Sequence, residues 1–368
     1  MGKPIILLGE AHGENEARLG KPFVGASGIE LLRMLNEADL IDLTETDYLY
    51  LSRYYSAGRN GAELINAIWE LHPEVYRTNV FQQHPPGNKL EYFCGPKGEG
   101  IGGFGPLLTS KYVRREFTYE LERLGDELVS VDPNLIVCLG NSALWALTGA
   151  TGITKYRGST RLSTHTAADF KLLPTYHPAA VLRQWELRPT TVIDLMKAAR
   201  EGEYPDIRRP KREIWIEPNL EDMERFYEQH IQQCRILSVD IETAGSQITC
   251  IGFSTGHKVA IVIPFYDSRK KGRNYWANEK DERRAIGFIK RVLESRKVRK
   301  LFQNGLYDIA FIWRAWGIRV YGAEEDTMLL HHSLQPESLK SLGFLGSVYT
   351  DEGSWKTMRK TATIKRDE

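Results

Sequence analysis

Two groups of residues in this sequence have types and spacings that suit chemistry. The first group lies in a glycine-rich segment, residues 9–28, which follows the short apolar run Pro4–Leu8. Glycines in such a segment let the backbone approach a ligand and present amide donors to it. The segment matches neither GxGxxG nor GxxxxGK[ST]. It therefore indicates a ligand-binding loop without these two nucleotide-binding fingerprints.

The second group is a set of acidic residues in the C-terminal half. Asp240 and Glu242 are separated by one residue near the end of an apolar run, so a strand would place them on one face. Paired carboxylates at a strand end suit a divalent cation, and ordinary surface charge is the alternative. Asn304 and Asp308 are four residues apart, which predicts that they share one face of a helix.

Apolar patterning places the glycine-rich loop in an α/β unit. Buried strands are predicted at Pro4–Leu8 and Leu135–Leu139, and helices at Ile29–Leu35, Val113–Leu128 and Ser142–Leu147. Strands that alternate with helices imply a parallel sheet with helices on its faces. Sites in such sheets lie beyond the carboxyl ends of the strands.

A proline-rich basic segment separates this unit from a second one. We assign residues 1–205 to the first domain, 206–213 to a basic linker and 214–368 to the second domain. Strands in quick succession, followed by helices, favour a mixed sheet in the second domain. Its predicted strands are Ile214–Ile216, Ile236–Val239, Ile248–Phe253 and Val259–Phe265, and its predicted helices are 220–233, 282–294 and 308–316.

Composition narrows the class of protein. The 368 residues include 49 Lys and Arg against 48 Asp and Glu, a net charge of +1, which excludes a uniformly basic coat protein for nucleic acid but not a local basic groove. No apolar run approaches the roughly 20 residues that span a bilayer, so no membrane partner is expected. The four cysteines form no CxxC pair, which predicts reduced thiols and a cytoplasmic protein.

Four segments in order give the first domain a family resemblance. Residues 1–200 resemble the uracil-DNA glycosylase superfamily, closest to its family-4 type, through the segments Pro22–Gly25, Thr78–Asn88, Leu135–Gly140 and Leu173–Arg183. The resemblance implies a three-layer, parallel-sheet α/β fold and the excision of uracil from DNA. Such an enzyme flips a base out of the helix, stacks it and reads its edge.

The resemblance also implies roles for single residues. Phe23 would stack on uracil, Asn79 would read its edge and His177 would donate to O2 as negative charge develops there. Taken singly, each has a structural alternative: a core Phe, a turn-forming Asn and a structural His. Among Glu10, Glu14 and Glu16, we favour Glu10 as the carboxylate that positions water or stabilises a cationic sugar.

Two basic residues are candidates for contacts to DNA. Arg183 and Lys155 would bind phosphates, and solvated surface is an equal alternative for both.

The first domain departs from the family pattern in three places. His12 replaces the proline of the usual Gly-Glu-Ala-Pro-Gly motif, adds a titratable group to the site and is itself a candidate uracil-binding residue. Gly13 stands where a better-known branch has a bulky aromatic that blocks the methyl group of thymine. Family-4 members hold an iron–sulfur cluster with four cysteines, but Cys94 and Cys138 lack ligand spacing, so we predict no iron–sulfur cluster.

Residues 212–368 resemble the 3′–5′ proofreading exonuclease domain of family-A DNA polymerases, in the DnaQ-like, RNase H-fold group. The resemblance implies that Asp240, Glu242 and Asp308 bind Mg²⁺ or Mn²⁺, and that Asn304 helps to seat the DNA strand end. For Asp326, a structural role as a helix cap is the better interpretation.

The last motif of that family, Tyr-x-x-x-Asp, is missing, because Tyr349 is followed by Asp351 at the wrong spacing. We therefore expect a C-terminally incomplete domain with an impaired exonuclease. Some phage DNA polymerases resemble this layout, which makes a separate polymerase polypeptide a possible partner.

Two functions stay open at this point. The first is an enzyme that excises uracil from single- or double-stranded DNA in the host cytoplasm, coupled to the exonuclease domain. The second is a non-catalytic module that binds DNA or senses uracil for a split phage polymerase.

Overall fold

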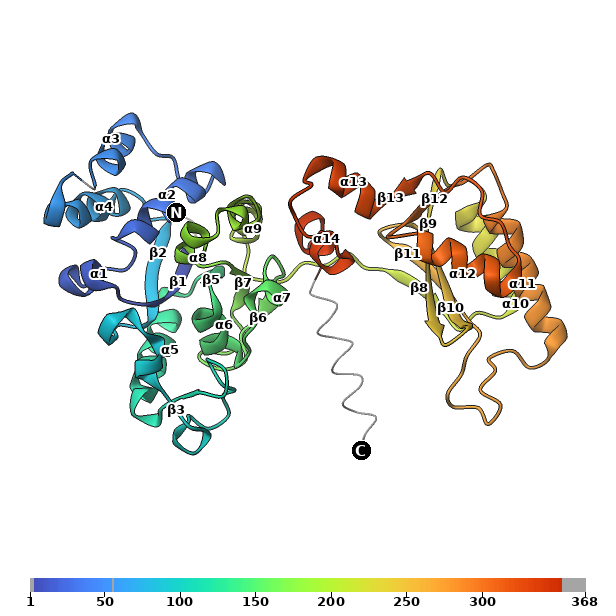
Figure 1. Ribbon diagram of the computed structural model, residues 1–368, viewed down its shortest axis with the longest axis horizontal. Coiled ribbons are helices and arrows are strands. Elements are labelled where there is room, and N and C mark those ends of the chain that lie inside the picture. The colour runs from blue at the N-terminus through green and yellow to red at the C-terminus, as the bar shows by residue number, and fades with distance from the viewer. Residues whose placement is uncertain (1–2, 55, 353–368) are drawn as a thin grey trace. The chain divides into compact units, whose positions relative to one another are not determined.

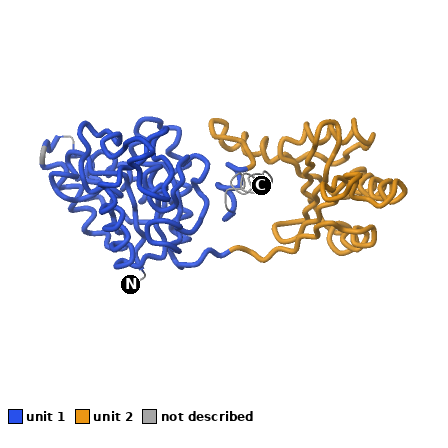
Figure 2. Tube along the Cα trace, turned by 90° about the horizontal axis from the view of Figure 1, so that it is seen from below, with its two compact units in different colours: residues 1–208, 343–368 blue, residues 209–342 orange. Residues whose placement is uncertain are grey.

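The computed structural model describes residues 3–54 and 56–352 and divides them between two compact units. Unit 1 contains residues 1–208 together with the segment from Gly343 onward, and unit 2 contains residues 209–342 (Figure 2). The boundary after Arg208 falls within the predicted linker. The assignment of the segment from Gly343 to unit 1 differs from the sequence analysis, which assigned it to the second domain.

The sheet of unit 1 has the order β2-β1-β5-β7-β6. Strands β1, β2, β5 and β7 run parallel to their neighbours, and the short β6 runs antiparallel to β7 at the edge. The central strands are apolar on both faces, as strands covered on both sides must be. The strands are β1 (Ile5–Ala11), β2 (Val75–Phe81), β5 (Leu135–Leu139), β6 (Arg161–Leu162) and β7 (Lys171–Thr175).

Helices cover both faces of this sheet (Figure 1). Residues on alternate sides of β1 enter two different hydrophobic clusters: Leu7 packs with residues of α2, α4 and α9, and Leu8 packs with residues of α5 and α6. The predicted three-layer α/β fold is therefore confirmed. The helices are α1 (Glu14–Leu19), α2 (Ala26–Glu37), α3 (Glu45–Arg53), α4 (Gly61–Glu70), α5 (Thr118–Val131), α6 (Asn141–Thr148), α7 (Ile153–Tyr156), α8 (Pro178–Arg183), α9 (Arg188–Glu201) and α14 (Leu342–Tyr349).

One predicted helix of unit 1 begins later than expected. Instead of a helix from Val113, a two-stranded ribbon and a 3₁₀ turn come first, because the backbone of Arg114 donates to Phe93 O at 2.9 Å. The remaining short elements are β3 (Cys94–Gly95), β4 (Tyr112–Val113) and the 3₁₀ turns η1 (Gly58–Asn60), η2 (Pro86–Asn88), η3 (Leu90–Phe93), η4 (Lys97–Glu99), η5 (Arg115–Phe117) and η6 (Trp185–Leu187).

Unit 2 has a mixed sheet of order β13-β12-β9-β10-β11-β8, as predicted. Strands β9, β10 and β11 are antiparallel, while β12 and β13 extend the sheet in parallel from β9, and β8 pairs in parallel with β11. The strands are β8 (Glu213–Ile216), β9 (Ile236–Ala244), β10 (Gln247–Gly256), β11 (Val259–Pro264), β12 (Arg299–Phe302) and β13 (Glu325–Asp326).

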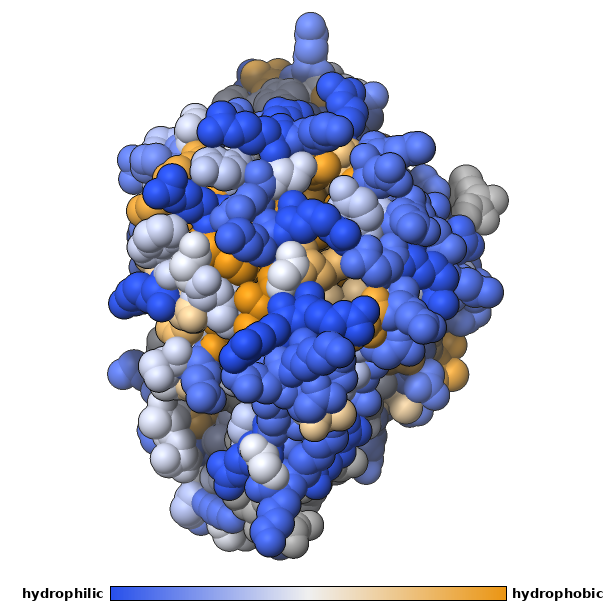
Figure 3. Space-filling model, turned by 90° about the vertical axis from the view of Figure 1, so that its right-hand side faces the viewer, coloured by the Kyte–Doolittle hydropathy of each residue, from blue (hydrophilic) through white to orange (hydrophobic). Residues whose placement is uncertain are grey.

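Helix α11 shows how the helices of unit 2 pack. Its apolar residues at helical spacing, among them Phe288, Ile289 and Val292, are buried in the core, and its charged residues face outward. Figure 3 looks onto this end of unit 2, where hydrophilic side chains cover most of the surface and apolar ones are visible in a band between them. The helices are α10 (Leu220–Phe226), the π-helical turn η7 (Tyr227–Ile231), α11 (Glu279–Leu293), α12 (Leu306–Trp316) and α13 (Thr327–Leu334).

In the described part of the chain, no helix is both long and apolar enough to cross a membrane.

Helix α5 offers a test of this packing, because two of its apolar residues have opposite exposure. Leu124 is fully buried and Val129 is 64% exposed. Leu124→Ala should lower the free energy of unfolding by about 2–5 kcal/mol, since it leaves a cavity. Val129→Ala should change it by less than about 0.5 kcal/mol. Urea unfolding of the full chain measures both, and equal effects would contradict the placement of α5.

Candidate functional site

The predicted pocket residues of unit 1 gather at the carboxyl ends of β1 and β2. Gly9 lies opposite Asn79 in the parallel register of these strands. A Cβ atom on Gly9 would lie 2.2 Å from Asn79 Oδ1 and 2.5 Å from Phe23 Cζ. The amide of Asn79 and the ring of Phe23 therefore meet over the backbone of Gly9, and any side chain there would separate them.

Phe23 is held in an unusual conformation. Its φ is 57°, which is uncommon outside glycine, and its carbonyl oxygen accepts a hydrogen bond from Trp69 Nε1 at 2.8 Å. Glu16 fixes the same loop, because its carboxylate accepts a hydrogen bond from the backbone of Gly25 at 2.8 Å. Phe23 and Asn79 are 4% and 2% exposed. These two hydrogen bonds thus fix the loop that positions the Phe23 ring.

His177 adds a hydrogen-bond donor to this group. Its ring centroid lies 6.1 Å from that of Phe23. The residue is the N-cap of α8, and its Nδ1 accepts from the backbone of Ala179 at 3.1 Å, which leaves the proton on Nε2. Burial, together with the nearby positive charge of Arg183, lowers the pKa of His177 to about 4. The side chain is therefore a neutral donor at physiological pH.

Glu10 lies in the same region, one residue beyond Gly9 on β1. Its Oε2 accepts a hydrogen bond from Ser142 Oγ at 2.7 Å, at the start of α6. Burial raises the pKa of Glu10, and the hydrogen bond and the charge of Arg183 oppose that rise. Arg183 itself is exposed at the end of α8 and influences both Glu10 and His177.

His12 is 5% exposed, and within the described residues its Nε2 has no hydrogen-bond partner. Burial, Arg123 and His84 lower the pKa of His12. The guanidinium of Arg123 also donates to the carbonyl oxygens of Asn79 and Val80 at 2.7 and 3.0 Å. Arg123 thus lies between the loop of His12 and the end of the strand that carries Asn79.

Lys155 is the predicted site residue of unit 1 with the least connection to this group. It lies on the short helix α7, with its Nζ 5.1 Å from the ring centroid of Tyr156. No hydrogen bond recorded among the described residues links it to Phe23, Asn79 or His177.

The acidic residues of unit 2 influence one another electrostatically. Asp240 and Glu242 project from the same, exposed side of β9, and burial together with Glu242 raises the pKa of Asp240. Asp308 lies in the first turn of α12, where burial is the largest of the effects that raise its pKa to about 6, and Asp240 and Asp326 contribute.

These acids do not form a closed ligand shell. Within residues 3–54 and 56–352, no group of three His, Cys, Asp or Glu side chains is arranged to hold a metal ion. Asp308 Oδ1 accepts a hydrogen bond from the backbone of Ile241 at 3.2 Å, which connects the start of α12 to β9.

One expectation about this group is wrong. Asn304 precedes α12 in a left-handed turn, with φ 59°, and so does not share a helix face with Asp308. Asp326 holds this turn, because its carboxylate accepts hydrogen bonds from the backbones of Asn304 and Gly305. It also accepts from Met328 at the start of α13, so its predicted role as a helix cap is confirmed.

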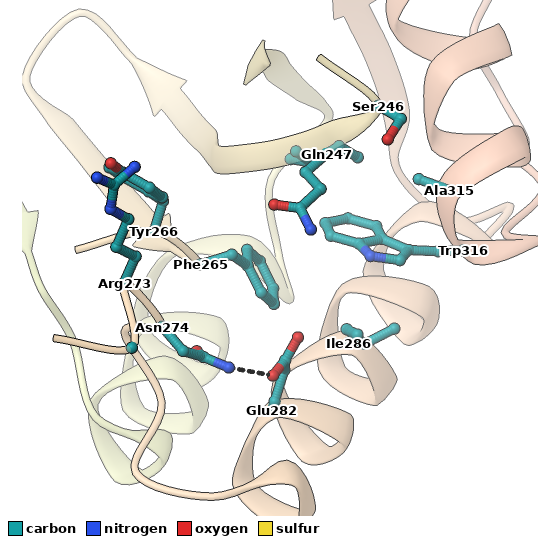
Figure 4. A pocket seen from close by; sticks show the side chains of 12 residues that line it. Ser246, Gln247, Phe265, Tyr266, Arg273, Asn274, Glu282, Ile286, Ala315 and Trp316 are labelled. Carbon is teal, nitrogen blue, oxygen red and sulfur yellow. Dashed lines mark hydrogen bonds between the residues drawn. The ribbon is translucent and has the colours of Figure 1, made fainter. Parts of the chain in front are cut away.

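A cavity of about 620 Å³ in unit 2 lies apart from these acids, since none of them lines it (Figure 4). Phe265 and Trp316 face its interior, and Asn274 donates to Glu282 at its edge. Nothing in its lining resembles a reacting centre.

Sequence reasoning missed three residues that support the pocket: Arg123, Ser142 and Trp69. Ser142 could have been found, because it follows the predicted strand 135–139, whose carboxyl end must lie beside that of β1. Arg123 and Trp69 act through contacts between distant segments, which no local pattern indicates.

The low pKa of His177 can be measured. Since the folded state keeps the imidazole neutral down to about pH 4, the unfolded chain takes up the proton first as the pH falls below 6.5. The free energy of unfolding should therefore fall between pH 6.5 and 4, by at most roughly 3 kcal/mol. Long-range ¹H–¹⁵N NMR, with His177→Gln to identify the signal, follows the proton. Titration near pH 6.5 would contradict the described hydrogen bond.

Comparison with known sequences gives two family matches. Residues 2–200 match the sequence model described as the uracil DNA glycosylase superfamily, and residues 216–366 match that described as 3′–5′ exonuclease. A type-4 uracil-DNA glycosylase of Sulfurisphaera tokodaii is 28% identical over 198 residues, which cover 52% of this chain and 67% of that protein. A DNA polymerase of Bacillus phage SP01 is 23% identical over 321 residues, which cover 77% of this chain and 31% of the polymerase.

Among solved structures, NrnC of Brucella melitensis aligns with a TM-score of 0.27 and 18% identity, covering 39% of this chain and 63% of that one. The chain thus spans less than a third of the phage polymerase and less than two thirds of NrnC. Because the glycosylase match covers more than half of its 368 residues, the chain belongs to the uracil-DNA glycosylase superfamily, with a 3′–5′ exonuclease domain following in the same polypeptide.

Proposed function

We propose that unit 1 excises uracil from DNA by hydrolysing the N-glycosidic bond. The observation that carries the proposal is the meeting of Asn79 and Phe23 over Gly9, beside the neutral donor His177. An aromatic face, an amide and an imidazole N–H are the groups that a flipped uracil requires. The type-4 uracil-DNA glycosylases among the relatives support the same activity.

Each group has a role in this reaction. Phe23 stacks on the base, and the Asn79 amide donates to O4 and accepts from N3–H, a pattern that cytosine reverses. His177 Nε2 donates to O2 as the departing base becomes an anion, and its neutral ring avoids giving that anion a proton prematurely. Glu10, held by Ser142, positions the water that attacks the sugar carbon or stabilises the positive charge there.

Three other residues complete the proposed site. Arg183 is exposed and electrostatically coupled to Glu10 and His177, which supports a phosphate contact at the pocket entrance. Lys155 is a second, more distant phosphate contact. His12 contacts the uracil edge through its buried Nε2, for which the described residues provide no partner.

Removal of the Asn79 amide tests the glycosylase. Asn79→Ala should slow uracil release on the order of 10²-fold, as for the loss of one positioned hydrogen-bonding group. Gln83→Ala is the matched control, because it removes an exposed amide four residues downstream. Alkaline cleavage of single- and double-stranded oligonucleotides containing uracil, under single-turnover conditions, measures the rate. Unchanged release by Asn79→Ala would remove this residue from the mechanism.

The same assay decides the alternative, a non-catalytic module that binds DNA or senses uracil for a phage polymerase. The unpartnered His12 in place of proline and the polymerase relative that matches 77% of this chain favour it. Binding of the oligonucleotide without uracil release, at excess protein, would support this second function.

For unit 2, we propose a site for Mg²⁺ or Mn²⁺ formed by Asp240, Glu242 and Asp308. Their donors are hard carboxylate oxygens. Burial raises the pKa values of Asp240 and Asp308, and the negative charges of Glu242 and Asp326 add smaller contributions that a cation would relieve. When bound, such ions activate water and stabilise the leaving 3′ oxygen in phosphodiester hydrolysis. Asn304 would contact the DNA strand end. We propose that 3′–5′ degradation by this chain is weak, because Tyr349 and Asp351 do not have the spacing of the Tyr-x-x-x-Asp motif.

Metal binding has a readout besides nuclease activity. Mg²⁺ or Mn²⁺ should raise the Tm of the full chain, because binding to the folded state alone stabilises it. Asp240→Ala should abolish the rise, whereas Glu228→Ala, which removes an exposed carboxylate elsewhere in unit 2, should leave it intact. Absence of a rise in the unaltered protein would remove the metal site. Rapid degradation of single strands that is lost in Asp308→Ala would contradict the proposed weakness of the nuclease.

The proposal includes no iron–sulfur cluster, because unit 1 contributes only the buried thiols Cys94 and Cys138. Bound iron with visible absorption would contradict this. A separate DNA polymerase polypeptide as partner and a cytoplasmic location, that of the host for a phage protein, belong to the same proposal.

A further inference from the structure

The segment from Phe344 to Asp351 is part of unit 1, although the exonuclease match extends over it. Helix α14 contacts the turn that follows α7. A Cβ atom on Gly158, whose φ is +69°, would lie 2.7 Å from Asp194 Oδ1 and 3.0 Å from Ser347 O, so the turn packs closely against both α9 and α14. The chain thus returns to the glycosylase unit after it has formed the sheet of unit 2.

Two buried charged residues of unit 1 donate hydrogen bonds to this segment. Arg157 and Lys197 are 2% and 3% exposed. Arg157 Nη1 donates to Ser347 Oγ at 2.8 Å, and its guanidinium lies 5.2 Å from the ring centroid of Phe344. Lys197 Nζ donates to the carbonyl oxygen of Thr350 at 2.6 Å. A buried guanidinium or ammonium group is tolerated only when its donors find such acceptors.

The network continues from Arg157 into the sheet. Its Nε and Nη2 both donate to the carboxylate of Asp194, which is fully buried on α9. Asp194 also accepts a hydrogen bond from Thr175 Oγ1 at 2.7 Å. Thr175 is the last residue of β7, two residues before His177. A continuous chain of contacts therefore runs from Ser347 to the base of the loop that holds His177.

We propose that Ser347 and Phe344 are positioning residues of the glycosylase site, and that they act on His177 through Arg157, Asp194 and Thr175. The inference rests on the proposed excision of uracil, and it adds a segment of the exonuclease match to that active site. Loss of the Ser347 acceptor leaves a buried N–H of Arg157 unpaired, which loosens Asp194 and with it the end of β7. Small displacements of a catalytic group slow catalysis more than they weaken binding.

The test uses the full chain with Phe344→Ala/Ser347→Ala. The control is Leu342→Ala, at an exposed position at the start of the same helix. We expect single-turnover uracil release to fall about tenfold, while affinity for the uracil oligonucleotide changes less than about twofold. The NMR signals of the His177 ring should shift, and amide exchange at residues 157–160 and 175–177 should accelerate about tenfold. The control should match the unaltered protein.

The NMR and exchange measurements separate this inference from the proposed function. If the unaltered protein releases no uracil, the proposed function fails, but a shifted His177 signal still supports the network. If His177 and the amides of 157–160 and 175–177 are unchanged in the double variant, the inference is overturned, whatever the activity. Should the double variant fail to fold, Ser347→Ala alone, which removes one hydroxyl, is held to the same criteria.

Discussion

The whole site of unit 1 depends on the absence of one side chain at Gly9. The parallel register of β1 and β2 brings the Asn79 amide against the backbone of Gly9, and the strained loop of Phe23 closes over the same point. A Cβ atom on residue 9 would overlap with both the Asn79 amide and the Phe23 ring. The other devices around it, such as the Trp69 hydrogen bond and the Glu16 contact to Gly25, keep the ring and the amide in this arrangement.

Buried charged residues fix the loops of unit 1 to the sheet. Arg123 holds the end of β2 through two carbonyl oxygens, and Lys171 bonds both Glu201 and the carbonyl oxygen of Asp206, where the linker begins. Such groups add little net stability, because their desolvation offsets their attraction. They instead make one arrangement of the loops much better than any other, since each alternative leaves a charge unpaired.

Most of the secondary structure could be predicted from the sequence, because buried parallel strands such as 135–139 are short apolar runs that end in glycine. The resemblance to the glycosylase superfamily also supplied Phe23, Asn79 and His177 as candidates. The sequence could not reveal that Asn304 adopts a left-handed turn, because that turn depends on Asp326, which is distant in sequence. Nor could it reveal Arg123 or Arg157, since a surface arginine and a buried one look identical until the fold pairs them.

The return of the chain to unit 1 after unit 2 has a consequence for the order of synthesis. Residues 209–342 must all be made between Asp194 and Ser347, which takes roughly ten seconds at common translation rates of about 5–20 residues per second. During that interval Arg157 and Lys197 can already bond Asp194 and Gly158, but the donors that later bond Ser347 and Thr350 lack these partners. The strands of the exonuclease sheet are therefore synthesised before the glycosylase unit can form its hydrogen bonds to Ser347 and Thr350.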